Sequence, residues 1–328
     1  MLRRRTLSII FLSLFVVSGL TSVMGNEIIP ASAETTGGST ITDLSGITVG
    51  IYEGYINNID PRVNQSRQAL FNMFTWMNAS VFIFNTTDLL NGCLWACEIL
   101  AIPEGLGPTM ENRLADDGLQ IIREWVALGG SYIGVRGSAA MAMNGSYFEG
   151  YTTTFDLALV NGTSYEVEDL DSIQMTNVSI NRDSTGPDLS NMPANMSVLF
   201  RTGRYFVPSP GQEIICIANY THNNQPAMIA AEYGEGNLFI SSPHFEYEEN
   251  GERDGTDYMD AYDDPDSEWP MLLTISRWLV DSSPTVANMS SWPYTPPTLS
   301  PLPLELILIG GGIGAVLILV AVVIIKRR

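Results

Sequence analysis

The stretch Gly134–Ala139, "GVRGSA", follows the apolar run "WVALGGSYI" and precedes the small-residue run "AMAM". This order predicts a buried strand, a tight glycine turn and the start of a helix. A strand-to-helix turn of this kind is the layout of a nucleophile elbow, which holds a reactive side chain at its tip. The tip residue here is Arg136, and a guanidinium is not a nucleophile because it stays protonated and offers only hydrogen-bond donors.

Apolar strands and helical segments alternate on both sides of this turn. The segments "ITVGIYEG", "SVFIFN", "CEILAIPEG" and "SYIGV" predict strands, whereas "NQSRQALFNMFTWM" and "ADDGLQIIREWVALGG" have helical apolar spacing. Residues 151–210 predict further strands and loops. The strand pattern then resumes, with "EYGEGN" as a hairpin turn, and "SEWPMLLTISRWLVDSS" predicts a closing helix capped by Asp266 or Ser267. We therefore expect an α/β domain over residues 46–281, a three-layer sandwich with a mostly parallel central sheet.

Both ends of the chain have the composition of targeting segments. Residues 1–33 combine three arginines, an apolar run and small residues, which predicts a signal peptide and polar lead-in; an uncleaved anchor is the alternative. The run from Leu306 to Ile325 carries no charge, and we expect a transmembrane helix over residues 304–325. The basic tail 326–328 places the carboxyl terminus in the cytoplasm. The Pro/Ser/Thr-rich residues 282–303 predict a stalk, so the domain lies outside the cell membrane.

The external part is strongly acidic. Six of the 16 Lys and Arg residues lie at the two ends, which leaves 10 arginines against 36 Asp and Glu, a net charge near −26. This charge argues against a nucleic-acid partner, because neutralising phosphates needs a basic face. Cations or basic proteins fit the charge better. Candidate glycosylation sites occur as Asn-x-Ser/Thr at Asn64, Asn78, Asn85, Asn144, Asn161, Asn177, Asn195, Asn219 and Asn288, as expected of a surface glycoprotein.

Three short motifs, in order and spacing, carry a family resemblance. "EILAIPEGLGPTM", "GGSYIGVRGSAAMAM" and "AAEYGEGNLFISSPHFE" together resemble the core of class I glutamine amidotransferase-like domains, a flavodoxin-like fold. The closest variant is the domain at the amino end of some biotin-protein ligases. "RTGRYFVPSPG" and the opening "VGIYEG" also fit their places. The resemblance spans residues 46–281 and implies no cofactor.

The resemblance also implies what each site residue would do. In active members a cysteine on the elbow attacks an amide, a histidine takes its proton, and a glutamate two residues later orients the histidine. His244 and Glu246 keep the last two positions, whereas Arg136 replaces the nucleophile. Glu104 replaces the first glycine of the turn that would hold the oxyanion, and Gly105 remains. These departures imply a non-catalytic member of the family.

Several interpretations of the site stay open from the sequence. Arg136 either pairs with Glu246, Glu104 or Glu53 in a structural role, or binds the carboxylate or phosphate of a small anionic ligand. A hydrolase that uses Ser138 with His244 and Glu246 is one alternative function. A purely structural or adhesive surface protein, working through a protein partner, is another.

The cysteines and the acidic segment give weaker signals. Cys93 and Cys97 are a possible local disulfide, which extracellular conditions favour. With His222 and His244 as its only histidines and no spaced ligand cluster, the chain predicts no zinc site. Residues 246–268 hold many carboxylates and predict a solvated loop; calcium binding is the alternative, although the loop lacks the "DxDxDG" pattern.

Overall fold

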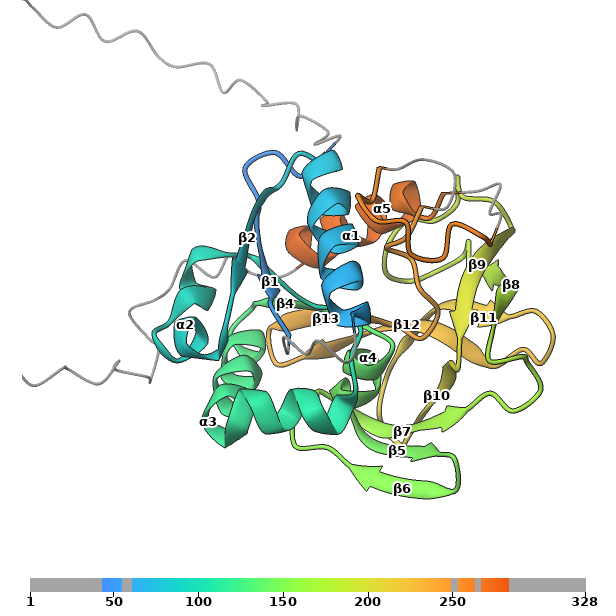
Figure 1. The fold of residues 1–328 in the computed structure, drawn as a ribbon, viewed down its shortest axis with the longest axis horizontal. Coiled ribbons are helices and arrows are strands. Elements are labelled where there is room, and N and C mark those ends of the chain that lie inside the picture. The colour runs from blue at the N-terminus through green and yellow to red at the C-terminus, as the bar shows by residue number, and fades with distance from the viewer. Residues whose placement is uncertain (1–42, 55–60, 249–252, 263–266, 283–328) are drawn as a thin grey trace, which may run out of the picture. The chain divides into compact units, whose positions relative to one another are not determined.

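The computed structural model describes residues 43–54, 61–248, 253–262 and 267–282 (Figure 1). The helices are α1 (Arg62–Trp76), α2 (Thr86–Leu90), the 3₁₀ helix η1 (Cys93–Ala96), α3 (Gly107–Ala127), α4 (Gly137–Ala142) and α5 (Trp269–Asp281). The strands up to the middle of the chain are β1 (Thr48–Tyr52), β2 (Ser80–Phe84), β3 (Ile99–Ile102), β4 (Ser131–Val135), β5 (Met143–Phe148), β6 (Tyr151–Thr154) and β7 (Val160–Glu166). The remaining strands are β8 (Ile173–Ile180), β9 (Asn195–Arg201), β10 (Arg204–Pro208), β11 (Ile215–Tyr220), β12 (Pro226–Tyr233) and β13 (Gly236–Ser241).

The central sheet is mixed, so the expectation of a mostly parallel sheet is wrong. Its nine strands run in the order β2-β1-β3-β4-β13-β12-β11-β8-β9. The strands from β2 to β13 in this order are parallel, whereas β12, β11, β8 and β9 pair antiparallel with their neighbours. The α/β architecture itself is confirmed.

Connection length explains the antiparallel half. A parallel pair needs a crossover of about a dozen residues or more, whereas a hairpin needs only about two. Strands β12 and β13 are joined by Gly234 and Glu235 alone, and Gly234 takes the positive φ of 64° that such a turn requires. Among the described residues between β7 and α5 no helix could return a strand in the parallel direction, so β8, β9, β11 and β12 pair antiparallel with their neighbours in the central sheet.

Two hydrophobic cores lie on the two faces of the central sheet. Strand β1 contributes Val49 and Ile51 to one core and Tyr52 to the other, as expected for a strand buried on both faces. Helices α1 and α5 cover the first face, and α3 and α4 cover the second (Figure 1). This arrangement gives the three layers that the alternation of strands and helices predicts.

A second, four-stranded sheet completes the second core. Its order is β10-β7-β5-β6, and β5 and β7 are parallel whereas the other pairs are antiparallel. Met143, Val160 and Phe206 direct one face of this sheet into the core beneath α3 and α4. The other face carries partly exposed side chains, Tyr147 among them.

The predicted targeting segments lie outside the described residues. They are the signal segment 1–33, the stalk after Ser282, the transmembrane helix 304–325 and the tail 326–328. Within the part of the chain that the structure describes, no helix is both long enough and apolar enough to span a membrane.

The possible disulfide between Cys93 and Cys97 is not formed, because all three cysteines have free thiols. Cys93 begins η1, whereas the buried Cys97 packs beneath β1 against Gly50, where an added Cβ would lie 3.2 Å from the sulfur. Burial raises the pKa of the Cys93 thiol to about 12. Cys97 is therefore part of the hydrophobic core, and Cys93 belongs to the 3₁₀ turn beside it.

Candidate functional site

Arg136 occupies the tip of the predicted elbow between β4 and α4. Its backbone has φ 52° and ψ −101°, a conformation that is costly for any residue with a Cβ. The backbone N–H of Arg136 donates to the carbonyl of Ser241, 2.7 Å away at the end of β13. The tight strand-to-helix turn expected from the sequence is therefore present, with an arginine at its tip.

The elbow packs directly against the turn that follows β3. A Cβ on Gly137 would lie 1.6 Å from the carbonyl oxygen of Gly105, so only glycine fits this approach. The contact brings the second turn, which contains Glu104, beside the tip of the elbow. Two motifs that the sequence separates by a whole helix thus form one site.

Three groups of the protein hold the Arg136 guanidinium. Nη1 donates to Glu104 Oε1 at 2.6 Å, Nε donates to the carbonyl of Arg201 at 2.7 Å, and Nη2 donates to the hydroxyl of Thr202. The side chain is only 9% exposed. Of the three carboxylates considered from the sequence, Glu104 is therefore the partner.

His244 and Glu246 are arranged as a base and its orienting carboxylate. His244 Nδ1 lies 3.0 Å from Glu246 Oε1, which also accepts from the Ser66 hydroxyl at 2.7 Å. The Ser66 oxygen in turn accepts from the backbone N–H of Glu104 at 2.9 Å. All of these side chains are buried, so the pair keeps the geometry that the resemblance implies.

The other nitrogen of His244 faces a carboxylate. Nε2 lies 3.6 Å from Glu104 Oε2, too far for a hydrogen bond, and has no other partner in the described structure. In an active member this nitrogen would face the nucleophile. Glu104, held by Arg136, is thus interposed between the elbow and the base.

The charges around Glu104 keep it ionised. Burial alone would raise its pKa, but the electrostatic influence of the neighbouring His244, Arg136 and Arg201 side chains outweighs burial and holds the pKa below its usual value of 4.5. Burial lowers the pKa of Arg136 and Glu104 opposes that shift. The guanidinium nevertheless remains charged at neutral pH, because the ordinary pKa of an arginine side chain lies far above neutral pH.

Arg201 forms a further layer behind the ion pair. Its Nη1 lies 3.7 Å from Glu104 Oε1 and donates to the hydroxyl of Tyr258, and its guanidinium lies 5.8 Å from the centre of the Tyr258 ring. No motif in the sequence assigns a role to the individual residues Arg201, Thr202, Ser66 or Tyr258. A signal existed for the first two, because they open the "RTGRYF" stretch that fits the family resemblance.

The remaining candidates lie near the elbow but are engaged elsewhere. The Ser138 hydroxyl accepts from the backbone N–H of Val135 at 2.8 Å and lies 2.8 Å from the carbonyl of Ile102. It is fully buried and caps the elbow, as a first-turn serine should. The described hydrogen bonds of Glu53 are made by its backbone: its N–H donates to the carbonyl of Phe84 at 2.8 Å, and its carbonyl accepts from Arg67 at 2.9 Å.

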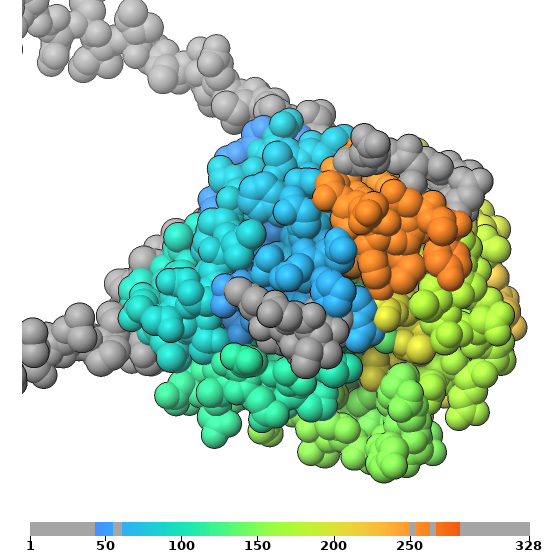
Figure 2. Space-filling view, viewed as in Figure 1, coloured from blue at the N-terminus to red at the C-terminus, as the bar shows by residue number. Residues whose placement is uncertain are grey.

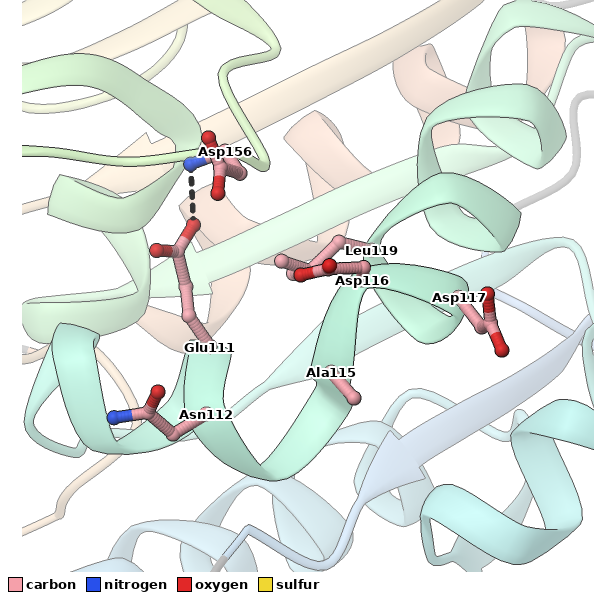
Figure 3. Close-up of a pocket in the computed structure, with 7 residues that line it drawn as sticks. All are labelled: Glu111, Asn112, Ala115, Asp116, Asp117, Leu119 and Asp156. Carbon is pink, nitrogen blue, oxygen red and sulfur yellow. Dashed lines mark hydrogen bonds between the residues drawn. The ribbon is translucent and has the colours of Figure 1, made fainter.

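An acidic pocket of ≈ 470 Å³ lies at a kink in α3, apart from the elbow residues. Its lining includes Glu111, Asp116, Asp117 and Asp156, and the kink falls at Ala115, where φ is 56° (Figure 3). Glu111 Oε1 accepts from the backbone N–H groups of Asp156 and Leu157. Burial raises the pKa of Glu111. In the described ranges, no group of three or more His, Cys, Asp or Glu side chains is placed to hold a metal ion.

In the part of the acidic segment 246–268 that the structure describes, two carboxylates are bonded to protein donors. Glu248 pairs with Arg253 at 2.6 Å, and Asp254 accepts from the backbone of Glu248 and Thr256. Residues 253–262 lie against α1, where Thr256 donates to Gln65 (Figure 2). The described residues 253–262 are therefore part of the packed surface, and protein donors engage the carboxylates of Glu248 and Asp254.

Comparison with known proteins agrees with the resemblance read from the sequence. The family model described as "Biotin-protein ligase, N terminal" matches residues 63–266. A solved ThuA-like protein from Bacteroides uniformis is similar with a TM-score of 0.48 and 11% identity, over 78% of this chain and 96% of that one. A solved glutamine amidotransferase is similar with a TM-score of 0.46 and 14% identity, over 71% of this chain and 97% of that one. No curated protein sequence matches the chain.

Proposed function

Because the chain belongs to the biotin-protein ligase N-terminal family, we propose that it is a non-catalytic member of that family. We further propose that it is a membrane-anchored extracellular glycoprotein. The observation that carries the proposal is Arg136 at the position of the nucleophile, bonded to Glu104, to the Arg201 carbonyl and to Thr202. A guanidinium cannot attack an amide carbon. The Glu104 carboxylate would also repel an oxyanion forming at the same turn.

The ion network has a structural role in this proposal. It joins the turn after β3, the elbow after β4 and the turn between β9 and β10, where Arg201 and Thr202 lie. Glu104, the Arg201 carbonyl and the Thr202 hydroxyl accept hydrogen bonds from the Arg136 guanidinium. These contacts support a structural role for Arg136 rather than capture of a small anionic ligand. The Ser138 hydroxyl caps its own turn, so no observation favours a serine hydrolase.

The membrane location rests on the sequence. The signal segment 1–33, the charge-free run that ends at Ile325 and the cationic tail 326–328 support a single-pass anchor with the domain outside. Five of the nine sequons are exposed on the described surface, at Asn78, Asn144, Asn161, Asn177 and Asn195. These five are the positions at which the proposal expects glycans.

The catalytic part of the proposal is tested with the full chain in detergent. We expect no ammonia release from glutamine and no covalent adduct with a diazoketone analogue of glutamine. Ammonia release that disappears in a His244→Ala variant would overturn the proposal. So would labelling by a serine-directed phosphonate that disappears in Ser138→Ala. An active glutaminase of the same fold class serves as the positive control for both assays.

A further inference from the structure

Three tyrosines form a row across the solvent-facing side of the second sheet. Tyr205 on β10 pairs directly with Tyr165 on β7, and Tyr165 pairs directly with Tyr147 on β5. The rings of Tyr165 and Tyr205 are stacked, with centroids 5.6 Å apart, and those of Tyr147 and Tyr165 lie 6.2 Å apart. Tyr147 at the end of the row is 38% exposed. One stacked and one tilted pair of rings thus form a row on the partly exposed face of the sheet.

The row forms one wall of a groove. The groove has a volume of ≈ 420 Å³, and Asn223 and Gln225, which lie in and next to the turn between β11 and β12, also line it. Figure 1 shows the second sheet beside this hairpin. The two amide side chains offer both hydrogen-bond donors and acceptors. The groove is therefore lined by both aromatic rings and side-chain amides.

The charged side chains that line the groove are all acidic. Glu166, Glu168 and Asp169 line it where β7 ends, and no Lys or Arg is among its lining residues. Asp169 also lies 3.2 Å from Nε2 of His222. The whole external part has the same sign of charge, so the long-range field also attracts cations.

We propose that this groove binds the guanidinium and ammonium side chains of a basic protein segment, with the cation against the tyrosine rings and paired with Glu168 or Asp169. Tyrosine rings attract cations through the negative faces of their π systems, and guanidinium groups also stack on aromatic rings. The carboxylates complete the charge pairing, while the amides reach the peptide backbone. The inference uses the proposed function only for the location of the groove outside the cell, and binding itself does not depend on that location.

The test uses the full chain in detergent and a fluorescent peptide of arginine and glycine residues. The matched probe replaces each arginine by citrulline, which has nearly the same shape but no charge. We expect the arginine peptide to bind and the citrulline peptide not to bind, by fluorescence anisotropy at physiological ionic strength. Tyr165→Leu and Glu168→Gln should each weaken binding by about two- to fivefold, the effect of losing one exposed cation contact, whereas Tyr165→Phe should retain it.

A charge-matched control separates this groove from the general acidity of the protein. The double variant Asp116→Asn with Asp117→Asn removes two carboxylates from the pocket at the α3 kink and should leave binding unchanged. Equal weakening by this variant, or no change in Tyr165→Leu and Glu168→Gln, would overturn the proposal. Binding of a neutral gluco-oligosaccharide that Tyr165→Leu abolishes, with no binding of the arginine peptide, would assign the groove to glycans instead. Circular dichroism confirms that each variant is folded, and the glutamine assay reports separately on the elbow.

Discussion

Arg136 shows how the identity of one residue decides what an elbow can do within a single site. The elbow still imposes a φ of 52° on its tip residue, and His244 still bonds to Glu246. A buried arginine in that place requires a counter-charge, and Glu104 supplies it at 2.6 Å. Arg136 and Glu104, the two residues that depart from the family pattern, are therefore coupled. Either residue without the other would leave an uncompensated buried charge.

Acid should destabilise the domain through Glu104. A carboxyl whose pKa is lower in the folded state than its usual 4.5 contributes stability above that value, and loses it as the pH falls through the folded pKa. We therefore expect the free energy of unfolding to fall as the pH drops below about 4.5, measured by urea unfolding of the full chain.

The variant Glu104→Gln isolates this contribution. At neutral pH it should cost about 3–5 kcal/mol, because it leaves Arg136 buried without its charge partner. It should also lose the part of the acid sensitivity that Glu104 causes. Glu124→Gln, on the surface of α3 where Gln120 contacts it, is the control and should change stability by less than about 0.5 kcal/mol. Equal changes in the free energy of unfolding of the two variants would rule out the buried ion pair as a source of stability.

Among the elements, the close contact between two turns decides the site. The elbow between β4 and α4 meets the turn after β3 at Gly137, where there is no room for a side chain. This contact fixes Glu104 beside Arg136 and holds His244, which follows β13, within 3.6 Å of the same carboxylate. The parallel half of the sheet thus positions the site, and the antiparallel half contributes Arg201 from the end of β9.

Gly137→Ala should disrupt this arrangement. The new Cβ would meet the backbone of Gly105 at 1.6 Å, and a backbone atom cannot move aside as a flexible side chain can. We expect a loss of more than about 3 kcal/mol, measured as a lower Tm of the purified chain. Gly150→Ala is the control: its φ is 80° with open space around it, so only the backbone strain of about 1–2 kcal/mol should appear. Similar losses in both variants would show that the two turns are not in firm contact.

On the scale of the whole molecule, charge and the composition of the ends define the setting. Apart from the six basic residues at its two ends, the chain carries 10 arginines against 36 Asp and Glu, a net charge near −26 that attracts cations. Arg136 and Arg201 lie in the ion network around Glu104 at the elbow rather than on the open surface. The outer surface therefore stays acidic, which is the setting in which the groove beside Tyr165 would capture a basic partner.

Removal of the predicted anchor should release the domain. A chain that ends at residue 303 should appear in the culture medium of expressing cells, because it lacks the charge-free run that begins at Leu306. The full chain should stay in the membrane fraction after alkaline carbonate extraction. Protease added to intact cells should digest its domain. Retention of the shortened chain on the membrane would contradict a carboxyl-terminal anchor.

The sequence by itself determined the features that depend on local pattern. Apolar periodicity gave the order of strands and helices, and the glycines around Arg136 gave the elbow, because backbone conformation follows neighbouring residue types. The identity of Arg136, His244 and Glu246 at their positions was also readable from motif order. Each of these signals extends over a few residues of the chain.

Only the tertiary structure decided which groups meet. The Arg136 guanidinium donates hydrogen bonds to Glu104, 32 residues away, and to the carbonyl of Arg201, 65 residues away. These groups meet because the sheet order brings their turns together. The antiparallel half of the sheet and the row of Tyr147, Tyr165 and Tyr205 likewise depend on strand pairing across long separations. Pairing of this kind is set by the packing of the whole domain, and the hydrophobic pattern of a single strand is compatible with several neighbours.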